Sequence, residues 1–395
     1  MLRDRRGAIS VVTALTLVML LGFVGLAIDT GRMLAIRTEL QTSVDACALA
    51  GALELNGQAD ATDRALSAAM FLAAANRNTF QSAATVLGSS QITFSTVPGG
   101  PFLTSGGLPG SAARYVRCAA DLPGVATYFL SAIGIKTMPT KASAVAGVQP
   151  AQAVCSIPMA LCKSSNAQAA SGNFGYAVGD RAILGGTGNT GFFTWANVSG
   201  TLSGSGLDPY LQAFVGFGTC GATTANGRCI DIKTGVVSAL DDGWNARFGV
   251  YKQGGSGLSP TSAIPDLSGY GYRGAGIPAG GAYSDYLSRR VPARDPFQGR
   301  ISGYSVSTDV NRTYGAPFRR LAVMPVLDCA ASTCGSGARP VVGWACVLLL
   351  SPKASNENAE AEFVARADDP ATPCRASGIA GGAGATGPLV AALVQ

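Results

Sequence analysis

The sequence of 395 residues contains no histidine. Histidine is the commonest general base near neutral pH and a frequent metal ligand, so Ser-His-Asp catalysis, Cys-His catalysis and His-ligated metals are excluded. The sequence also lacks a Cys-x-x-Cys motif, so a zinc site would need four thiolates or carboxylates. We therefore expect no catalytic residue, no cofactor and no metal site, and interpret the chain as not an enzyme.

Charged residues are also scarce, at 13% of the chain, with a net charge of +6. No cluster of Lys and Arg interleaves with aromatic residues, so the electrostatic pattern of a nucleic-acid-binding protein is missing. Glycine is abundant instead, with 52 residues. This composition predicts a loop-rich, weakly charged surface, and we expect neither a nucleic-acid partner nor a small-molecule substrate.

One long apolar run is present. Residues 8–28 form 21 consecutive positions without a charge, enough to span a bilayer as one helix. Their Leu, Ile, Val and Phe side chains favour insertion by about 5 kcal/mol. The rival interpretation is a cleaved secretory signal, with Gly25 and Ala27 as the small residues near the cut. Apolar and small residues continue at helical spacing beyond the run, which favours an uncleaved anchor: Met33, Ile36, Leu40, Val44, Cys47, Ala48 and Gly51.

The flanks of this run indicate its orientation. Three arginines precede it, and the nearest basic residues after it are Arg32 and Arg37. This is a positive-inside bias, although a weak one. Ten cysteines in a large domain are typical of an oxidising compartment. We therefore place residues 1–7 in the cytoplasm as a tail and residues 29–395 outside it, with a single-pass helix between them.

Residues 29–148 are expected to form a helix-plus-sheet unit with a pilin-like outline. The N-terminal helix should run to about Leu55, where Asn56-Gly57 ends it. A second helix should begin near Asp60 and place Leu66, Met70 and Ala73 on one face. Alternating apolar residues predict strands at 91–97, 113–119 and 140–148, and residues 125–133 are interpreted as a short helix.

Residues 149–395 are expected to form a mostly β, loop-rich ectodomain. Short apolar runs at 191–198, 321–327 and 341–350 are separated by Gly, Ser and Pro turns. Residues 355–365 are interpreted as a short helix. The predicted fold class is therefore α+β, with a transmembrane helix that extends into a pilin-like unit and a disulfide-stapled ectodomain after it.

The cysteines of this ectodomain are candidates for structural disulfides, each contributing about 2–4 kcal/mol. Connectivity does not follow from sequence, so pairing of sequence neighbours is only a default. Cys47 and Cys118 remain for the first unit, where Cys47 lies on the helical stripe and a free buried thiol is the alternative. The default pairs are Cys155 with Cys162, Cys220 with Cys229 and Cys329 with Cys334, leaving Cys346 and Cys374.

The N-terminal segment resembles that of TadG-like proteins of the Flp (tight adherence) pilus-assembly family. The strings that carry the resemblance are Arg5-Arg6-Gly7, Gly25-Leu26-Ala27-Ile28-Asp29-x-Gly31-Arg32 and Arg37-x-x-Leu40-Gln41-x-x-x-Asp45-Ala46-x-Ala48-Leu49-Ala50-Gly51-Ala52. A looser resemblance to the ectodomain of related proteins rests on Cys155-Ser156-Ile157-Pro158, Trp195, Cys220, Trp244-Asn245-Ala246-Arg247-Phe248-Gly249-Val250-Tyr251 and Gly387-Pro388-Leu389-Val390.

Two properties of the wider family are not implied. Larger TadG-like members carry a von Willebrand A domain, whose metal motif Asp-x-Ser-x-Ser is absent; the nearest string, at 266–270, lacks the second serine. Prepilin-like relatives are cut after a glycine that is followed five residues later by Glu. Val12 occupies that position after Gly7, so the sequence does not support such processing.

The resemblance implies a membrane-anchored structural or assembly component of a Flp (Tad-type) pilus system. It would reside in the bacterial inner membrane, act in the periplasm, and have the lipid bilayer and other pilus-assembly or pilin-like proteins as partners. Candidate residues for docking of the helix on a partner are Asp29, Gly31, Arg32 and Gly51. The alternatives are an envelope-anchored adhesin or carbohydrate-binding protein, and a hydrolase that uses carboxylates alone, such as Asp241 and Asp242.

Overall fold

A computed structural model gives the fold as two compact units. It describes residues 6–78, 83–165, 172–184, 192–200, 202, 208–216, 219–233, 241–254, 257–289, 295–307, 309–316, 319–335, 337–354, 357–374, 378–381 and 385–394, so most of the expected tail lies outside the described residues. The first unit comprises Met1–Val148 and Ala391–Gln395, and the second comprises Gln149–Val390. The sequence-based division had assigned the last five residues to the second unit.

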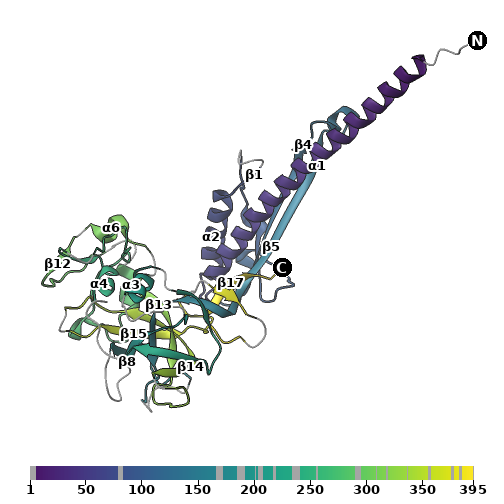
Figure 1. Ribbon diagram of the computed structural model, residues 1–395. Helices are drawn as coiled ribbons and strands as arrows, with labels where there is room; N and C mark the ends of the chain where they lie inside the picture. Colours follow the sequence, from purple (N-terminus) through teal and green to yellow (C-terminus); the bar gives the residue numbers. More distant parts are fainter. Residues whose placement is uncertain are drawn as a thin grey trace, which may run out of the picture. The chain divides into compact units, whose positions relative to one another are not determined.

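Helix α1 (Arg6–Glu54) is the longest element, with 49 residues and a length of about 70 Å (Figure 1). Its side chains from Ile9 to Val24 are exposed on every side, whereas from Gly25 onward one face is buried. Among the described residues it is the one helix long and apolar enough to cross a membrane. The predicted long apolar helix is confirmed, and it ends one residue before Leu55, ahead of Gly57 in a left-handed conformation.

The buried face of α1 packs on a sheet and on helix α2 (Ala61–Ala75). The buried residues of α2 are Thr62 and four alanines at every fourth position, Ala61, Ala65, Ala69 and Ala73. Sequence analysis had placed Leu66 and Met70 on this face, but Leu66 is half-buried and Met70 is exposed. Alanine at every fourth position allows the two helix backbones to approach closely, so the small residues rather than the large ones face α1.

The sheet of the first unit contains β3 (Ile92–Ser95), β4 (Tyr115–Ala126) and β5 (Thr137–Ser156), which are antiparallel neighbours. Strand β5 pairs with β4 from Thr137 to Gly147, and its last residues pair with strands of the second unit. A short pair, β1 (Arg77–Asn78) and β2 (Ala83–Ala84), follows α2. Strand β17 (Leu389–Leu393) also joins β5, which accounts for the last residues of the chain belonging to this unit.

The predicted short helix at 125–133 is wrong. Strand β4 continues to Ala126, and only a single 3-10 turn, η3 (Leu130–Ile133), lies between β4 and β5. The apolar string had suggested a helix because it contains no charge or glycine. In the structure its side chains lie on a long β-hairpin, and the irregular pairing between Leu122 and Val125 lets the two strands continue beyond that point.

The second unit is built on a sheet that closes on itself. The strands β14 (Ala338–Leu349), β13 (Leu321–Leu327), β6 (Met159–Cys162), β8 (Phe192–Ala196), β7 (Arg181–Leu184) and β15 (Glu360–Arg366) pair in this order, and β15 pairs back with β14. Strand β10 (Cys229–Lys233) joins both β14 and β8. One buried cluster takes side chains from all six ring strands, which places it inside the ring.

Further short elements surround this ring. They are α3 (Asp208–Val215), β9 (Thr219–Thr223), α4 (Asp241–Ala246), β11 (Val250–Lys252), η5 (Gly274–Gly276), α5 (Tyr283–Ser288), β12 (Tyr304–Val306), α6 (Val310–Tyr314) and β16 (Gly378–Ala380). The predicted mostly β character of this unit is confirmed. The short helix predicted at 355–365 is wrong, because Glu360–Arg366 is strand β15, held between β14 and β7.

All ten cysteines form five disulfides, and the default pairing of sequence neighbours is wrong. The bonds join Cys47 to Cys118, Cys155 to Cys220, Cys162 to Cys329, Cys229 to Cys334, and Cys346 to Cys374. The Cys162–Cys329 bond shows how tertiary pairing replaces pairing of sequence neighbours. Strands β6 and β13 are parallel neighbours, so Cys162 at the end of β6 lies beside the residues that follow β13.

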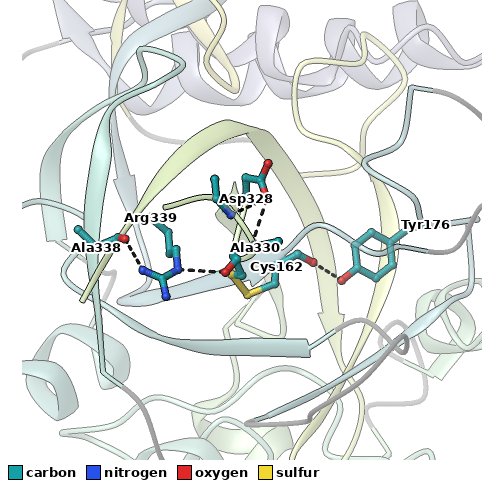
Figure 2. Close-up of a disulfide and its surroundings, with 8 residues drawn as sticks. Cys162, Tyr176, Asp328, Ala330, Ala338 and Arg339 are labelled. Carbon is teal, nitrogen blue, oxygen red and sulfur yellow. Dashed lines mark hydrogen bonds between the residues drawn. A yellow bond between two sulfur atoms is a disulfide. The ribbon is translucent and has the colours of Figure 1, made fainter. Parts of the chain in front are cut away.

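Figure 2 shows the surroundings of this Cys162–Cys329 bond. The Tyr176 hydroxyl donates to the Cys162 carbonyl oxygen at 2.5 Å, and Arg339 Nε donates to the Cys329 carbonyl oxygen at 3.0 Å. The backbone on both sides of the disulfide is therefore fixed by side chains from other segments.

We expect peptide mapping under non-reducing conditions to recover a peptide that links Cys162 to Cys329, and thiol counting in denaturant to find no free thiol. The reason is that the parallel pairing of β6 with β13 places Cys162 beside Cys329 in the folded protein. A peptide linking Cys155 to Cys162, or a large fraction of free thiols, would contradict both the ring topology and the oxidised state.

Candidate functional site

Asp29 is the first residue of α1 whose charge is buried in the protein, with 2% of its surface exposed. Its carboxylate accepts hydrogen bonds from the backbone N–H groups of Tyr128, Phe129 and Leu130, at 3.0, 2.9 and 2.7 Å. These N–H groups begin the η3 turn, where no helical carbonyl precedes them. Burial opposes ionisation, but the three donors and the Arg32 charge outweigh it and lower the pKa of Asp29 below the ordinary 3.8.

Arg32 and Gly25 bind the same hairpin. The Arg32 guanidinium donates to the Ala126 carbonyl oxygen and lies 4.5 Å from the centre of the Tyr128 ring. Gly25 is one helical turn before Asp29, and a Cβ atom there would lie 2.6 Å from the Phe129 Cβ. We call Gly25, Asp29 and Arg32 the hairpin clamp. Together they hold the end of the β4–β5 hairpin against α1.

The four candidate docking residues of α1 therefore do not share one surface. Asp29 and Arg32 belong to the hairpin clamp, and Gly51 is buried, with Val116 Cγ1 of β4 3.2 Å from where its Cβ would be. Gly31 alone is open, since nothing lies within 4 Å of its Cβ position. Gly51 is thus corrected to a packing position, because its missing side chain leaves room for the protein's own sheet.

An exposed stripe of α1 does remain beyond the apolar run. It consists of Gly31, Leu34, Thr38 and Thr42 at helical spacing. The Thr38 hydroxyl donates to the Leu34 carbonyl oxygen and the Thr42 hydroxyl to that of Thr38, both at 3.0 Å. Because both hydroxyls are hydrogen-bonded within the helix, the surface that these residues form is only weakly polar and protrudes little. We call this set the α1 stripe.

A shallow hollow of about 590 Å³ lies between α1 and the sheet of the first unit. Arg37, Arg117 and Lys141 contribute positive charge to its lining, and Asp121 is paired with Lys141 at 2.7 Å. The Gln41 amide closes one side by donating to Asp45 and to the Ser143 carbonyl oxygen. The hollow contains no nucleophile with a neighbouring base, so its chemistry is that of a polar surface.

In the second unit, residues 244–251 are part of the buried core. Trp244 Nε1 donates to the Ser351 carbonyl oxygen at 2.8 Å, and the Asn245 amide exchanges two hydrogen bonds with the backbone of Lys353. Arg247 donates to the carbonyl oxygens of Phe214 and Arg319. These residues are buried and tie α4 to neighbouring loops, so they have a packing role and are not accessible to a ligand.

The carboxylates considered for catalysis, Asp241 and Asp242, are also held in contacts with other residues of the protein. Asp241 is buried against Lys353, with a 2.6 Å contact to its ammonium, and Asp242 accepts from the Tyr304 hydroxyl at 2.6 Å. In the structure these two residues begin helix α4. Asp266 accepts from Tyr286 and from the backbone of Arg320. In the described part of the chain, no three Asp, Glu, Cys or His residues gather as metal ligands.

A carbohydrate-binding surface would need two or more aromatic side chains facing solvent in one groove. Among the described residues of the second unit, Tyr314 is the one aromatic side chain that is largely exposed. The hollow beside β12, of about 660 Å³, has Tyr304 as its aromatic lining residue. The described residues of the second unit therefore give no specific support to the adhesin alternative.

Two glycines on α1 allow a matched test of these assignments. We expect Gly51→Leu to destabilise the first unit by about 1–3 kcal/mol, because the new side chain would overpack against Val116. Gly31→Leu should be neutral or stabilising by up to about 1 kcal/mol, since leucine favours helix and meets open space. Denaturant unfolding of the oxidised full-length protein measures both. Equal effects of the two variants would contradict the assignment.

Asp29→Asn is expected to release the hairpin end from α1, because a neutral amide cannot accept three charge-assisted bonds. Amide exchange of Tyr128, Phe129 and Leu130 should accelerate in this variant, with Asp121→Asn as the control. In the wild type the lowered pKa means that protection is complete above pH 3.8 and is lost as the pH falls through the folded value. Unchanged exchange in Asp29→Asn would disprove the clamp.

Comparison with known proteins identifies the segment that contains these residues. Residues 7–54 match the family model described as putative Flp pilus-assembly TadE/G-like. No curated protein and no solved structure matches the chain. The match coincides with α1 and contains both the hairpin clamp and the α1 stripe. The looser resemblance of the second unit stays a prediction. The N-terminal segment of this chain is thus TadE/G-like, as its resemblance predicted.

Proposed function

We propose that this protein is a single-pass component of a Flp (Tad-type) pilus-assembly system in the bacterial inner membrane. Its N-terminus lies in the cytoplasm, residues 8–28 span the membrane, and residues 29–395 lie in the periplasm. It carries out no catalysis itself and acts through contacts with other pilus-assembly or pilin-like proteins. The observation that carries the proposal is the coincidence of the TadE/G-like match with α1.

The two parts of α1 support the proposed topology, in which the first part spans the membrane and the second belongs to the folded region outside it. The part from Ile9 to Val24 is apolar and exposed on all sides, which suits lipid as its surroundings. The part after it forms the core of the first unit, with Cys47 bonded to Cys118 of β4. A disulfide in this position suits an oxidising compartment, so we place the first unit outside the cytoplasm.

The α1 stripe is the docking surface that we propose for a partner helix. Gly31 and the two threonines let a second backbone approach closely, and Leu34 offers an apolar contact with 59% of its surface exposed. The stripe also lies directly beyond the apolar run, where a second membrane-anchored helix would run alongside α1. Gly51 is not part of this surface, because it packs against Val116 of the protein's own sheet.

Site-specific photocrosslinking in cells tests the proposal. A photoreactive residue at Leu34 should capture a protein of the pilus system, because this position lies on the α1 stripe. The same residue at Phe71 of α2, which is 73% exposed, is the matched control and should not capture it. A reporter fused after Gln395 should be active only outside the cytoplasm.

Four outcomes would contradict the proposal. Capture of the same products from Leu34 and Phe71 would remove the α1 stripe as the docking surface. A reporter active in the cytoplasm would reverse the topology. Mature protein that begins at Ile28 would show a cleaved signal and no anchor, and normal pili in a strain that lacks the protein would remove the assembly role.

A further inference from the structure

The end of the β4–β5 hairpin exposes an unusual amount of apolar surface. Tyr128, Phe129, Ile133, Ile135 and Met138 are all exposed, from 37% of the surface for Met138 to 74% for Ile133. Clusters of this kind are rare on water-facing surfaces and mark contact with a protein or a membrane. We call residues 127–138 the hairpin tip.

The hairpin clamp fixes the hairpin tip at a defined level of α1. Gly25 touches Phe129, and Asp29 and Arg32 bind the backbone on either side of Tyr128. Gly25 lies three residues inside the apolar run that ends at Ile28, which is about 4–5 Å along the helix axis. The run of 21 residues is about 31 Å long and so matches the hydrocarbon thickness without excess. When the run spans the bilayer, Phe129 is therefore at the depth of the acyl chains.

Backbone N–H groups of the hairpin tip are hydrogen-bonded within the protein, which suits the depth of the acyl chains. In an apolar medium each unpaired N–H costs several kcal/mol, so segments that enter it must satisfy these groups internally. Asp29 accepts from three consecutive N–H groups, as described above. Thr127 N–H donates to the Lys136 carbonyl oxygen at 3.0 Å and Ile135 N–H to that of Leu130 at 3.1 Å.

The polar groups of the tip lie where lipid headgroups would meet them. The Tyr128 ring contacts the Arg32 guanidinium, and amphipathic aromatic rings with nearby arginine are typical of the membrane–water interface. Lys136 is exposed, and its long side chain can direct the ammonium toward lipid phosphates while its methylenes cover apolar surface.

We propose that the hairpin tip inserts into the outer surface of the phospholipid bilayer that α1 spans, and so forms a second membrane contact. Phe129, Ile133 and Ile135 enter the boundary between headgroups and acyl chains. This inference rests on the membrane anchoring in the proposed function. Two contacts, held together by the hairpin clamp, fix the depth and rotation of α1, so the α1 stripe faces a set direction above the membrane.

Brominated lipids, which quench tryptophan in the acyl region, provide the test. The full-length protein is reconstituted in phosphatidylcholine–phosphatidylglycerol vesicles with and without bromine on the chains. Ile133→Trp is the tip probe, Phe71→Trp the matched control of equal exposure, and Phe23→Trp on α1 the reference for the membrane span. The native Trp195, Trp244 and Trp344 are buried, and their signal is subtracted using the wild type.

We expect bromolipid to quench Ile133→Trp and Phe23→Trp and to leave Phe71→Trp unchanged. Quenching of Phe23→Trp alone would overturn the tip proposal and leave the anchor intact. Absence of quenching at both positions would overturn the anchor itself. Blue-shifted but unquenched emission from Ile133→Trp would mean that a second copy of the chain, and not lipid, covers the tip, and would also overturn the proposal. Non-reducing peptide maps confirm that each variant is folded.

Discussion

The continuity of helix α1 is the constraint on which the first unit depends. A segment without charge is stable in lipid, whereas the next turns of the same helix supply the wall against which α2, β3 and β4 pack. A change in direction or register at Gly25–Arg32 would therefore separate the membrane span from the folded unit. The hairpin clamp is placed at this junction, and it uses a buried carboxylate and an arginine to bind backbone groups at the end of the β4–β5 hairpin.

The second unit is stabilised by other interactions than the first. Its ring of strands closes through the β14–β15 pairing, and four of the five disulfides lie within it. Arg320 is fully buried and donates to the carbonyl oxygens of Ser268, Tyr270, Leu349 and Leu350, so it joins the loop at 268–270 to the end of β14. Buried charge of this kind costs desolvation and is retained where it fixes loop geometry. The unit is thus a rigid scaffold without a reactive cluster among its described residues.

Sequence patterns predicted the elements whose determinants are local. The apolar run and the Asn56-Gly57 stop located α1, and the alternation at 91–97 located β3. Pairing partners were not predictable, because Cys162 meets Cys329 only after parallel strands from distant segments join. Residues 360–366 have good helix formers, yet the ring requires a strand between β14 and β7. Tertiary pairing overrides local preference in such cases.

The candidate site was also only partly predictable from the sequence, because its contacts join segments that are distant along the chain. Sequence analysis singled out Asp29 and Arg32 as candidates for docking on a partner, but the groups that they bind come from a hairpin about 100 residues later. Small residues on α1 suggested a docking face, and a sequence cannot distinguish a glycine that meets its own sheet from one that meets a partner. The Cβ positions separate Gly51 from Gly31. The signal for the hairpin tip was its uncharged apolar string, which had been interpreted as a helix.

Hydrogen exchange along α1 in the full-length protein, reconstituted in a bilayer, tests the central claim most directly. If one helix spans the membrane and continues into the first unit, amides from Ile9 to Glu54 are protected without interruption, including those around Gly31. Fast exchange confined to residues 29–35 would show two separate helices joined by a loose linker. That result would contradict the account, because the anchor and the folded unit would then be independent.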